Sequence, residues 1–161
     1  MVIDLFKKHQ IKNIVFSPGS RNAPLVIGFN SDKYFEKKVL VDERSAAFFA
    51  LGMAQQLKEP VAICCTSGSA VLNYAPAIAE AYYQKIPLFV ITADRPAEWI
   101  DHGEGQSMRQ NNVYKNFIGG SFNLPMLDHP DALWQTGVMI NEAIHITQLD
   151  SKPVHINFPF R

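Results

Sequence analysis

Residues 61–70 read VAICCTSGSA, an unbroken apolar run that ends in a turn of small polar residues. Short β-branched runs without polar alternation are typical of parallel strands that are covered on both faces. Four further runs share this character, and most are followed by Gly, Ser, Asp or Pro: Asn13–Phe16, Lys38–Val41, Leu88–Ala93 and Val154–Phe158. We therefore predict five strands of a buried parallel sheet.

Segments with helical spacing lie between the predicted strands. Apolar residues recur every three or four positions in residues 46–57 and again in residues 72–83, whereas Ala132–Gln148 is only loosely periodic. This alternation of strand and helix predicts a three-layer, doubly wound α/β domain with a mainly parallel sheet and helices on both faces. At 161 residues the chain is most simply a single domain, residues 1–161.

Composition narrows the classes of partner. Fifteen basic and fifteen acidic residues give no net charge, so nucleic acid is not an expected partner. No stretch approaches the roughly 20 apolar residues of a membrane span, and the N-terminus lacks a signal-peptide pattern, so we expect a cytoplasmic protein.

Cys64 and Cys65 should point to opposite faces of a strand as small buried residues. The five histidines form no ligand cluster with them, so no metal site of this chain alone is expected.

The longest stretch without a clear periodic signal is Arg95–Asp128. Loops of this length in compact domains are usually functional or locally disordered. Trp99, Tyr114 and Phe117 need somewhere to pack, which argues against disorder. We expect a short helix inside this segment.

Glu43 follows the apolar run Val39–Val41 and precedes a helical stretch, which places a carboxylate at a strand-to-helix corner. Open α/β sheets bind ligands at such corners, and a carboxyl group walled by apolar side chains could hold or pass a proton near neutral pH. Alternatively, Asp42 and Glu43 are only acids at a helix start, where negative charge is favoured. Position alone favours this second, structural interpretation.

Three other loops should meet at the same edge of the sheet. Ser17–Leu25 has a glycine turn and capping residues, and its backbone N–H groups with Arg21 suit a carboxylate or phosphate, although an ordinary capped turn would look the same. Thr66–Ala70 resembles a phosphate cradle only weakly, because it lacks both the Gly-x-x-x-x-Gly-Lys-Ser/Thr pattern of a P-loop and the Gly-x-Gly-x-x-Gly pattern of a dinucleotide site. Arg95 adds a second arginine, which alone would more often pair with a surface acid.

The argument for a site is that these loops converge. The carboxyl ends of parallel strands meet at one edge, so five polar side chains could surround one cleft, with guanidinium groups facing carboxylates and one acid reserved for proton transfer. These residues are Ser20, Arg21, Glu43, Arg95 and Gln106.

Several motifs closely resemble, in order and spacing, those of the 2-succinyl-5-enolpyruvyl-6-hydroxy-3-cyclohexene-1-carboxylate synthases, the thiamine diphosphate enzymes of menaquinone biosynthesis. The resemblance covers nearly the whole chain and favours the chemical interpretation of Glu43. It rests on Ser17–Leu25, Asp42–Phe48, Thr66–Ala70 and Thr92–Pro96, followed by Gly103 and Gln106.

The resemblance implies a role for each matching residue. In this family thiamine diphosphate lies between a pyrimidine-binding domain and a diphosphate-binding domain of another subunit, and the chain matches only the first. Glu43 aligns with the glutamate that hydrogen-bonds N1′ of the cofactor and drives its tautomerism, and Ser67 and Gly68 are expected to contact the cofactor. Substrate-side residues of the family align with Ser20, Arg21, Arg95 and Gln106.

The same resemblance implies that 2-oxoglutarate is decarboxylated and its remaining unit is added to isochorismate. No Gly-Asp-Gly segment is present, so the Mg2+ ligands are expected in a missing diphosphate-binding domain. Gly105 stands where the family commonly has Asn, which removes one amide contact. We expect a fragment that is inactive alone, from an enzyme that is a homo-oligomer. The alternatives are a separate subunit of a two-chain thiamine diphosphate decarboxylase and a non-catalytic anion-binding or dimerisation module.

Overall fold

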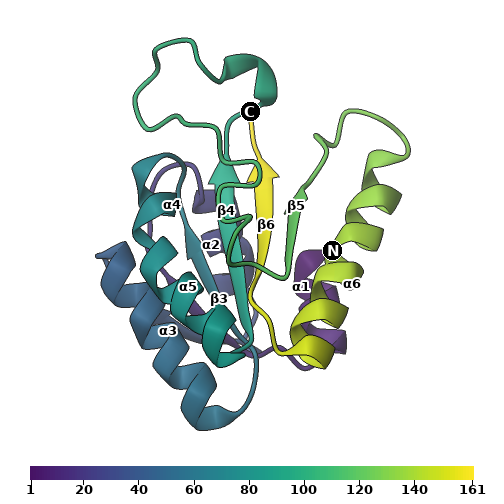
Figure 1. Cartoon of the computed structure of the whole chain (residues 1–161). Helices are drawn as coiled ribbons and strands as arrows, with labels where there is room; N and C mark the ends of the chain where they lie inside the picture. The colour runs from purple at the N-terminus through teal and green to yellow at the C-terminus, as the bar shows by residue number, and fades with distance from the viewer.

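The computed structural model describes all 161 residues and is built around a six-stranded sheet in which every strand pairing is parallel. The strand order is β2-β1-β3-β4-β6-β5. Figure 1 shows β3, β4, β6 and β5 side by side in this order. The strands are β1 (Asn13–Phe16), β2 (Glu36–Val39), β3 (Val61–Cys65), β4 (Leu88–Asp94), β5 (Gly120–Asn123) and β6 (Val154–Pro159).

Helices cover both faces of this sheet, which confirms the predicted three-layer α/β architecture (Figure 1). One core cluster joins the sheet to α3, α4 and α5, and a second joins its other face to α1, α2 and α6. Cys65 belongs to the first cluster and Cys64 to the second, and both are buried free thiols, as predicted. The helices are α1 (Val2–Lys8), α2 (Ala23–Ser31), α3 (Glu43–Leu57), α4 (Ser69–Asn73), α5 (Ala75–Gln84), α6 (Ala132–Asp150) and the 3-10 helix η1 (Ala97–Trp99).

The second strand differs from its prediction. It was expected at Lys38–Val41 but spans Glu36–Val39, because its register is set by pairing with β1, where Asn13 lies opposite Glu36. It is an edge strand, and Val39 is 64% exposed. The expectation that both of its faces are covered was therefore wrong.

Other elements were missed or merged. Strand β5 reads GSFN and has a single buried apolar side chain, Phe122, so its sequence carries little strand signal. Helix α1 was not predicted, whereas α2 begins after Asn22, where the Ser17–Leu25 turn was expected to open a helix. The helix expected over residues 72–83 is two helices, α4 and α5, that meet at Tyr74. Pro76 lies in the first turn of α5, where its missing N–H has no intrahelical partner to lose.

The segment after β4 arches above the carboxyl ends of the strands before the chain enters β5 (Figure 1). The short helix expected inside it is the three-residue η1. Tyr114 anchors the segment, since its side chain is 1% exposed and its hydroxyl donates to the carbonyl of Val71. Trp99 is less well covered and remains 38% exposed. No helix is both long and apolar enough to cross a bilayer.

Candidate functional site

The loops that follow β1 and β3 pack directly against each other at the carboxyl edge of the sheet. The backbone N–H of Ser17 donates to the carbonyl of Cys64 at 2.9 Å. A Cβ atom placed on Gly19 would lie 2.6 Å from Cβ of Thr66. The predicted convergence of these two loops is therefore real, and glycine at position 19 permits their close approach.

Glu43 is the first residue of α3, and its neighbour Asp42 performs the capping. Oδ1 of Asp42 accepts a hydrogen bond from the backbone N–H of Ser45 at 2.8 Å. The Ser45 side chain and, second, this backbone bond hold the pKa of the Asp42 carboxyl below its usual range. The half-buried Glu43 side chain makes no hydrogen bond or ion pair within the chain. The acid that caps the helix and the acid that is left free are thus two different residues.

The Glu43 carboxylate lies close to the end of β3. The pKa of the Cys65 thiol is well above its ordinary value, first because of burial and also because of the nearby Cys64 and the negative charge of Glu43. Cys65 is the last residue of β3 and directly precedes the Thr66–Ala70 turn. The structure therefore places Glu43 at the expected edge of the sheet.

Gly68 sits tightly beneath the loop that follows β4. Its φ angle is +78°, and an added Cβ atom would lie 2.6 Å from the backbone carbon of Gln106. Its N–H donates to Oε1 of Gln110 at 2.8 Å, and the neighbouring Ser67 hydroxyl donates to the carbonyl of Gln106 at 2.8 Å. Both polar groups that were expected to contact a cofactor are paired inside the chain, and their cofactor role stays a prediction.

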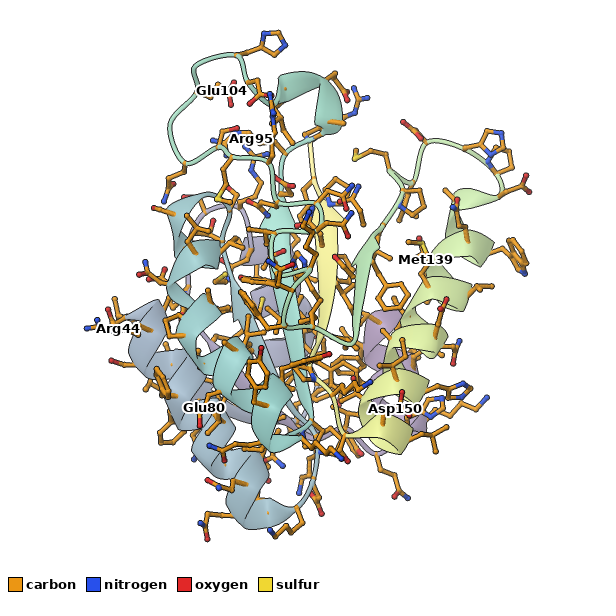
Figure 2. All side chains as sticks on the ribbon, in the orientation of Figure 1. Arg44, Glu80, Arg95, Glu104, Met139 and Asp150 are labelled. Atoms are coloured by element: carbon orange, nitrogen blue, oxygen red, sulfur yellow. The ribbon has the colours of Figure 1, made fainter.

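Arg95 is bound by the same loop, and its side chain is only 12% exposed. Nη1 donates to Oγ of Ser67 at 2.9 Å and to the carbonyl of Gln106, Nη2 donates to the carbonyl of Gly105 at 2.7 Å, and Nε donates to Oε2 of Glu104 at 2.6 Å. Figure 2 shows Arg95 and Glu104 together above the sheet. Gln106 contributes its carbonyl to this arrangement.

Arg21 approaches the same region from the loop after β1. It is half-buried, and Nη1 donates to the carbonyl of Phe160 at 3.0 Å. Burial raises the pKa of Asp94, while hydrogen bonds from Asn157 and from the Arg95 backbone, and the charges of Arg95 and Arg21, act in the opposite direction. The charges of both arginines therefore act on the Asp94 carboxyl, although neither guanidinium group is hydrogen-bonded to it. Ser20, which is exposed, makes no side-chain hydrogen bond.

A buried polar network that the sequence did not reveal lies beneath the arginines. Nδ2 of Asn157 donates to Asp94 and to Asn123, both at 2.7 Å. Oδ1 of Asn157 accepts from the Thr92 hydroxyl at 2.6 Å and from Nε2 of Gln110 at 2.8 Å. Thr92 and Asn157 are register partners on β4 and β6, a clue that is readable only once the pairing is known.

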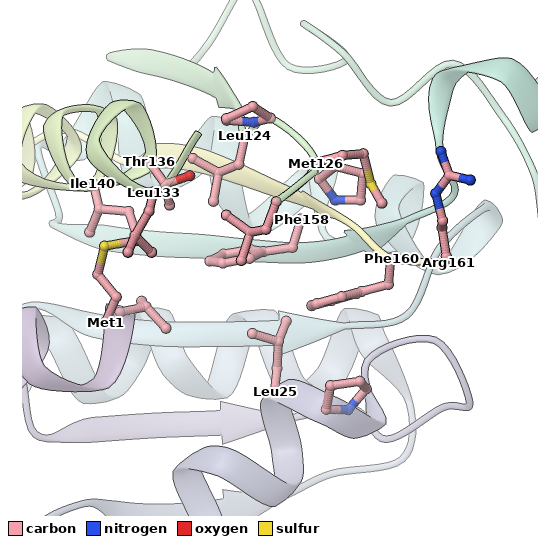
Figure 3. A pocket seen from close by; sticks show the side chains of 15 residues that line it. Met1, Leu25, Leu124, Met126, Leu133, Thr136, Ile140, Phe158, Phe160 and Arg161 are labelled. Atoms are coloured by element: carbon pink, nitrogen blue, oxygen red, sulfur yellow. The ribbon is translucent and has the colours of Figure 1, made fainter. Parts of the chain in front are cut away.

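Two cavities differ in their chemistry. A polar cavity of about 580 Å³ is lined by Asp94, Arg95, Gln110 and Asn123 among others, a size within the range of small-molecule sites. A mostly apolar cavity of about 410 Å³ lies beside it, and the two share Leu124 and Met126. Figure 3 shows the side chains that line this second cavity. Leu25, Leu133, Ile140, Phe158 and Phe160 line that second cavity. The chain has no cluster of three His, Cys, Asp or Glu side chains able to hold a metal ion.

Comparisons with known proteins agree on one family. Residues 1–114 match the family described as thiamine pyrophosphate enzyme, N-terminal TPP binding domain. The chain is 50% identical over 161 residues to 2-succinyl-5-enolpyruvyl-6-hydroxy-3-cyclohexene-1-carboxylate synthase of Cytophaga hutchinsonii, covering 98% of this chain and 29% of that protein. It is 52% identical over 159 residues to the synthase of the same name from Flavobacterium johnsoniae, covering 99% and 28%. The chain thus spans less than a third of the length of these relatives.

A solved structure shows the same fold. Benzoylformate decarboxylase from Polynucleobacter necessarius superposes with a TM-score of 0.81 over 98% of this chain and 29% of that chain, at 23% sequence identity. The matched residues 1–114 include Glu43, Gly68 and Arg95. The chain therefore belongs to the thiamine pyrophosphate enzyme family, as an N-terminal TPP-binding domain.

Proposed function

We propose that residues 1–161 are the pyrimidine-binding domain of a synthase that decarboxylates 2-oxoglutarate and adds the remaining succinyl-semialdehyde unit to isochorismate. The synthases named above, at 50% and 52% identity, support this assignment. Because the chain covers 28–29% of their length, the domain does not turn over substrate alone. The diphosphate-binding domain and the Mg2+ ligands belong to the rest of the enzyme.

The free carboxylate of Glu43 carries the proposal. Asp42 already caps α3, so capping does not explain a second acid that is half-buried and unpaired at a ligand-binding edge. A protonated nitrogen of a heteroaromatic ring suits such a carboxylate, and N1′ of thiamine diphosphate is the partner we assign. Bound thiamine diphosphate supplies the nucleophilic carbon for attack on a 2-oxo acid. Glu43 accepts the hydrogen bond at N1′ and holds the proton there.

The other predicted residues take the roles that their positions support. Arg21 and Arg95 provide positive charge near the polar cavity for substrate carboxylates. Ser20 and Gln106 are exposed beside them and offer groups for hydrogen bonds to substrate. Ser67 and Gly68 form the small-residue turn against which the cofactor packs.

We also propose that the complete enzyme is a cytoplasmic homo-oligomer. Phe48 and Phe49 are 43% and 44% exposed on α3, close in sequence to Glu43. Contiguous exposed apolar side chains often mark surfaces that other protein covers. A second subunit over this helix would exclude water from the Glu43 corner and thereby strengthen its hydrogen bond.

The test is Glu43→Gln in the protein at its natural length. We expect carbon dioxide release from 2-oxoglutarate, measured with isochorismate present, to fall by roughly a hundred- to ten-thousand-fold, the usual contribution of positioned proton transfer. Glu59→Gln is the matched control, because it is the same substitution at an exposed residue beyond the other end of α3. Full turnover in the Glu43 variant would overturn the proton role that we assign to Glu43.

A further inference from the structure

Arg95 is not free to receive a substrate carboxylate in this structure. A guanidinium has five N–H donors, and four hydrogen bonds to this chain already engage it. Carboxylates bind arginine most strongly through two parallel hydrogen bonds along one edge of the guanidinium. Glu104 occupies the Nε edge at 2.6 Å with a carboxylate of its own.

The two members of this ion pair differ in how firmly they are held. The Arg95 side chain is 12% exposed and is fixed by the Ser67 hydroxyl and two carbonyls, whereas the Glu104 side chain is 48% exposed. Glu104 stands between Gly103 and Gly105. A Cβ atom added to either glycine would have no neighbouring atom within 4 Å, so the space around the loop is open. Arg95 is therefore the fixed partner, and Glu104 is the one with room to leave.

We propose that Glu104 is a specificity-determining residue that competes with the substrate carboxylate for Arg95. The inference rests on the proposed function, which assigns Arg95 to a substrate carboxylate. An entering organic acid takes the Nε edge, and the Glu104 carboxylate moves into solvent on its glycine-flanked loop. One carboxylate replaces another, so the charge of Arg95 stays neutralised throughout. A ligand without a carboxylate cannot make this exchange, and Glu104 thereby discriminates against neutral analogues.

The expected effect is modest, because a partly exposed ion pair is weak. Replacing the charged competitor by its neutral isostere in Glu104→Gln should tighten the binding of a dicarboxylate by roughly two- to fivefold. Glutamine keeps the size of the side chain and can still accept a hydrogen bond from Nε. The gain in affinity therefore isolates the lost charge.

The experiment measures succinate and 2-oxoglutarate binding by calorimetry in the natural-length protein, with thermal unfolding as a check of the fold. Asp101→Asn is the matched control, because Asp101 lies in the same loop and pairs with Arg109 at 2.7 Å, away from Arg95. We expect tighter binding in Glu104→Gln and unchanged binding in Asp101→Asn. Once Arg95→Gln is also present, Glu104→Gln should have no effect on binding.

The outcomes separate this inference from the function on which it rests. Equal effects of the Glu104 and Asp101 variants, or weaker binding in Glu104→Gln, would overturn the competition, since only general charge or loop packing would then be at work. If Arg95→Gln leaves binding unchanged, the substrate role of Arg95 fails as well. If Arg95→Gln weakens binding but Glu104→Gln does nothing, only the competition fails.

Discussion

The Glu43 corner and the Arg95 corner lie on the same edge of the sheet, yet they hold their charged groups in opposite ways. Glu43 has no partner within the chain, and its neighbour Asp42 makes the capping bond. Arg95 is bound by Ser67, Glu104 and two loop carbonyls. The charge of Arg95 is paired inside the chain, whereas the half-buried Glu43 carboxylate is left open to a partner from outside. Changes around Arg95 should therefore affect stability, and changes at Glu43 should affect chemistry.

The largest expected effect lies under the Arg95 corner, at the fully buried His155. Its Nε2 lies 2.7 Å from the Thr92 hydroxyl, and burial lowers its pKa to about 3. In the unfolded chain the His155 imidazole takes up a proton near pH 6.5, whereas in the folded protein it stays neutral down to about pH 3. The contribution of His155 to stability is therefore fully present above pH 6.5 and is lost as the pH falls toward 3. We expect the free energy of unfolding to be about 3 kcal/mol lower at pH 4 than at pH 7 from this residue alone.

Denaturant unfolding across this pH range checks the prediction. His155→Asn should flatten the profile between pH 7 and pH 4, while His145→Gln, on the exposed face of α6, should leave it unchanged. Asp94 acts in the opposite sense, because burial raises its pKa and its contribution to stability is lost as the pH rises through that value. An unchanged slope in His155→Asn would show that the buried network is not the acid-sensitive part.

The next effect compares two glycines with the same backbone angle, Gly68 and Gly103, both at φ +78°. Gly68→Ala forces a Cβ atom to 2.6 Å from the backbone of Gln106, whereas Gly103 has nothing within 4 Å. Backbone strain alone costs about 1 kcal/mol, and overpacking adds 1–3 kcal/mol in general. We expect Gly68→Ala to lower the free energy of unfolding by about 3 kcal/mol and Gly103→Ala by about 1 kcal/mol.

Chemical denaturation of both variants decides this point. Equal losses would mean that the loop over Gly68 yields freely and does not clamp Arg95. Because Gln106 both covers Gly68 and accepts from Arg95, a displaced loop should also weaken the Glu104 contact. The Nε–H signal of Arg95 in nuclear magnetic resonance reports that contact directly.

The two corners were not equally readable from the sequence. The strand and helix around Glu43 follow from local patterns, so the corner was predicted even though β2 was placed two residues late. The contacts of Arg95 depend on a loop with Gln106 at φ +52°, which no periodicity encodes. Strand β5 escaped detection because its pairing with β6 joins Gly120 to Val154, and only Phe122 is buried in it. The structure of the Arg95 loop and of strand β5 thus depends on long-range pairing rather than on local propensity.

The smallest effect is the most discriminating, because it compares adjacent acids. Asp42→Ala removes the bond to the Ser45 N–H and should lower the free energy of unfolding by about 1 kcal/mol. Glu43→Gln breaks no contact within the chain and should change it by less than about 0.5 kcal/mol. Denaturant titrations of the two variants measure the difference. A Glu43 variant as destabilised as the Asp42 variant would show that this carboxylate supports α3, and its availability to an outside partner would then lose its physical basis.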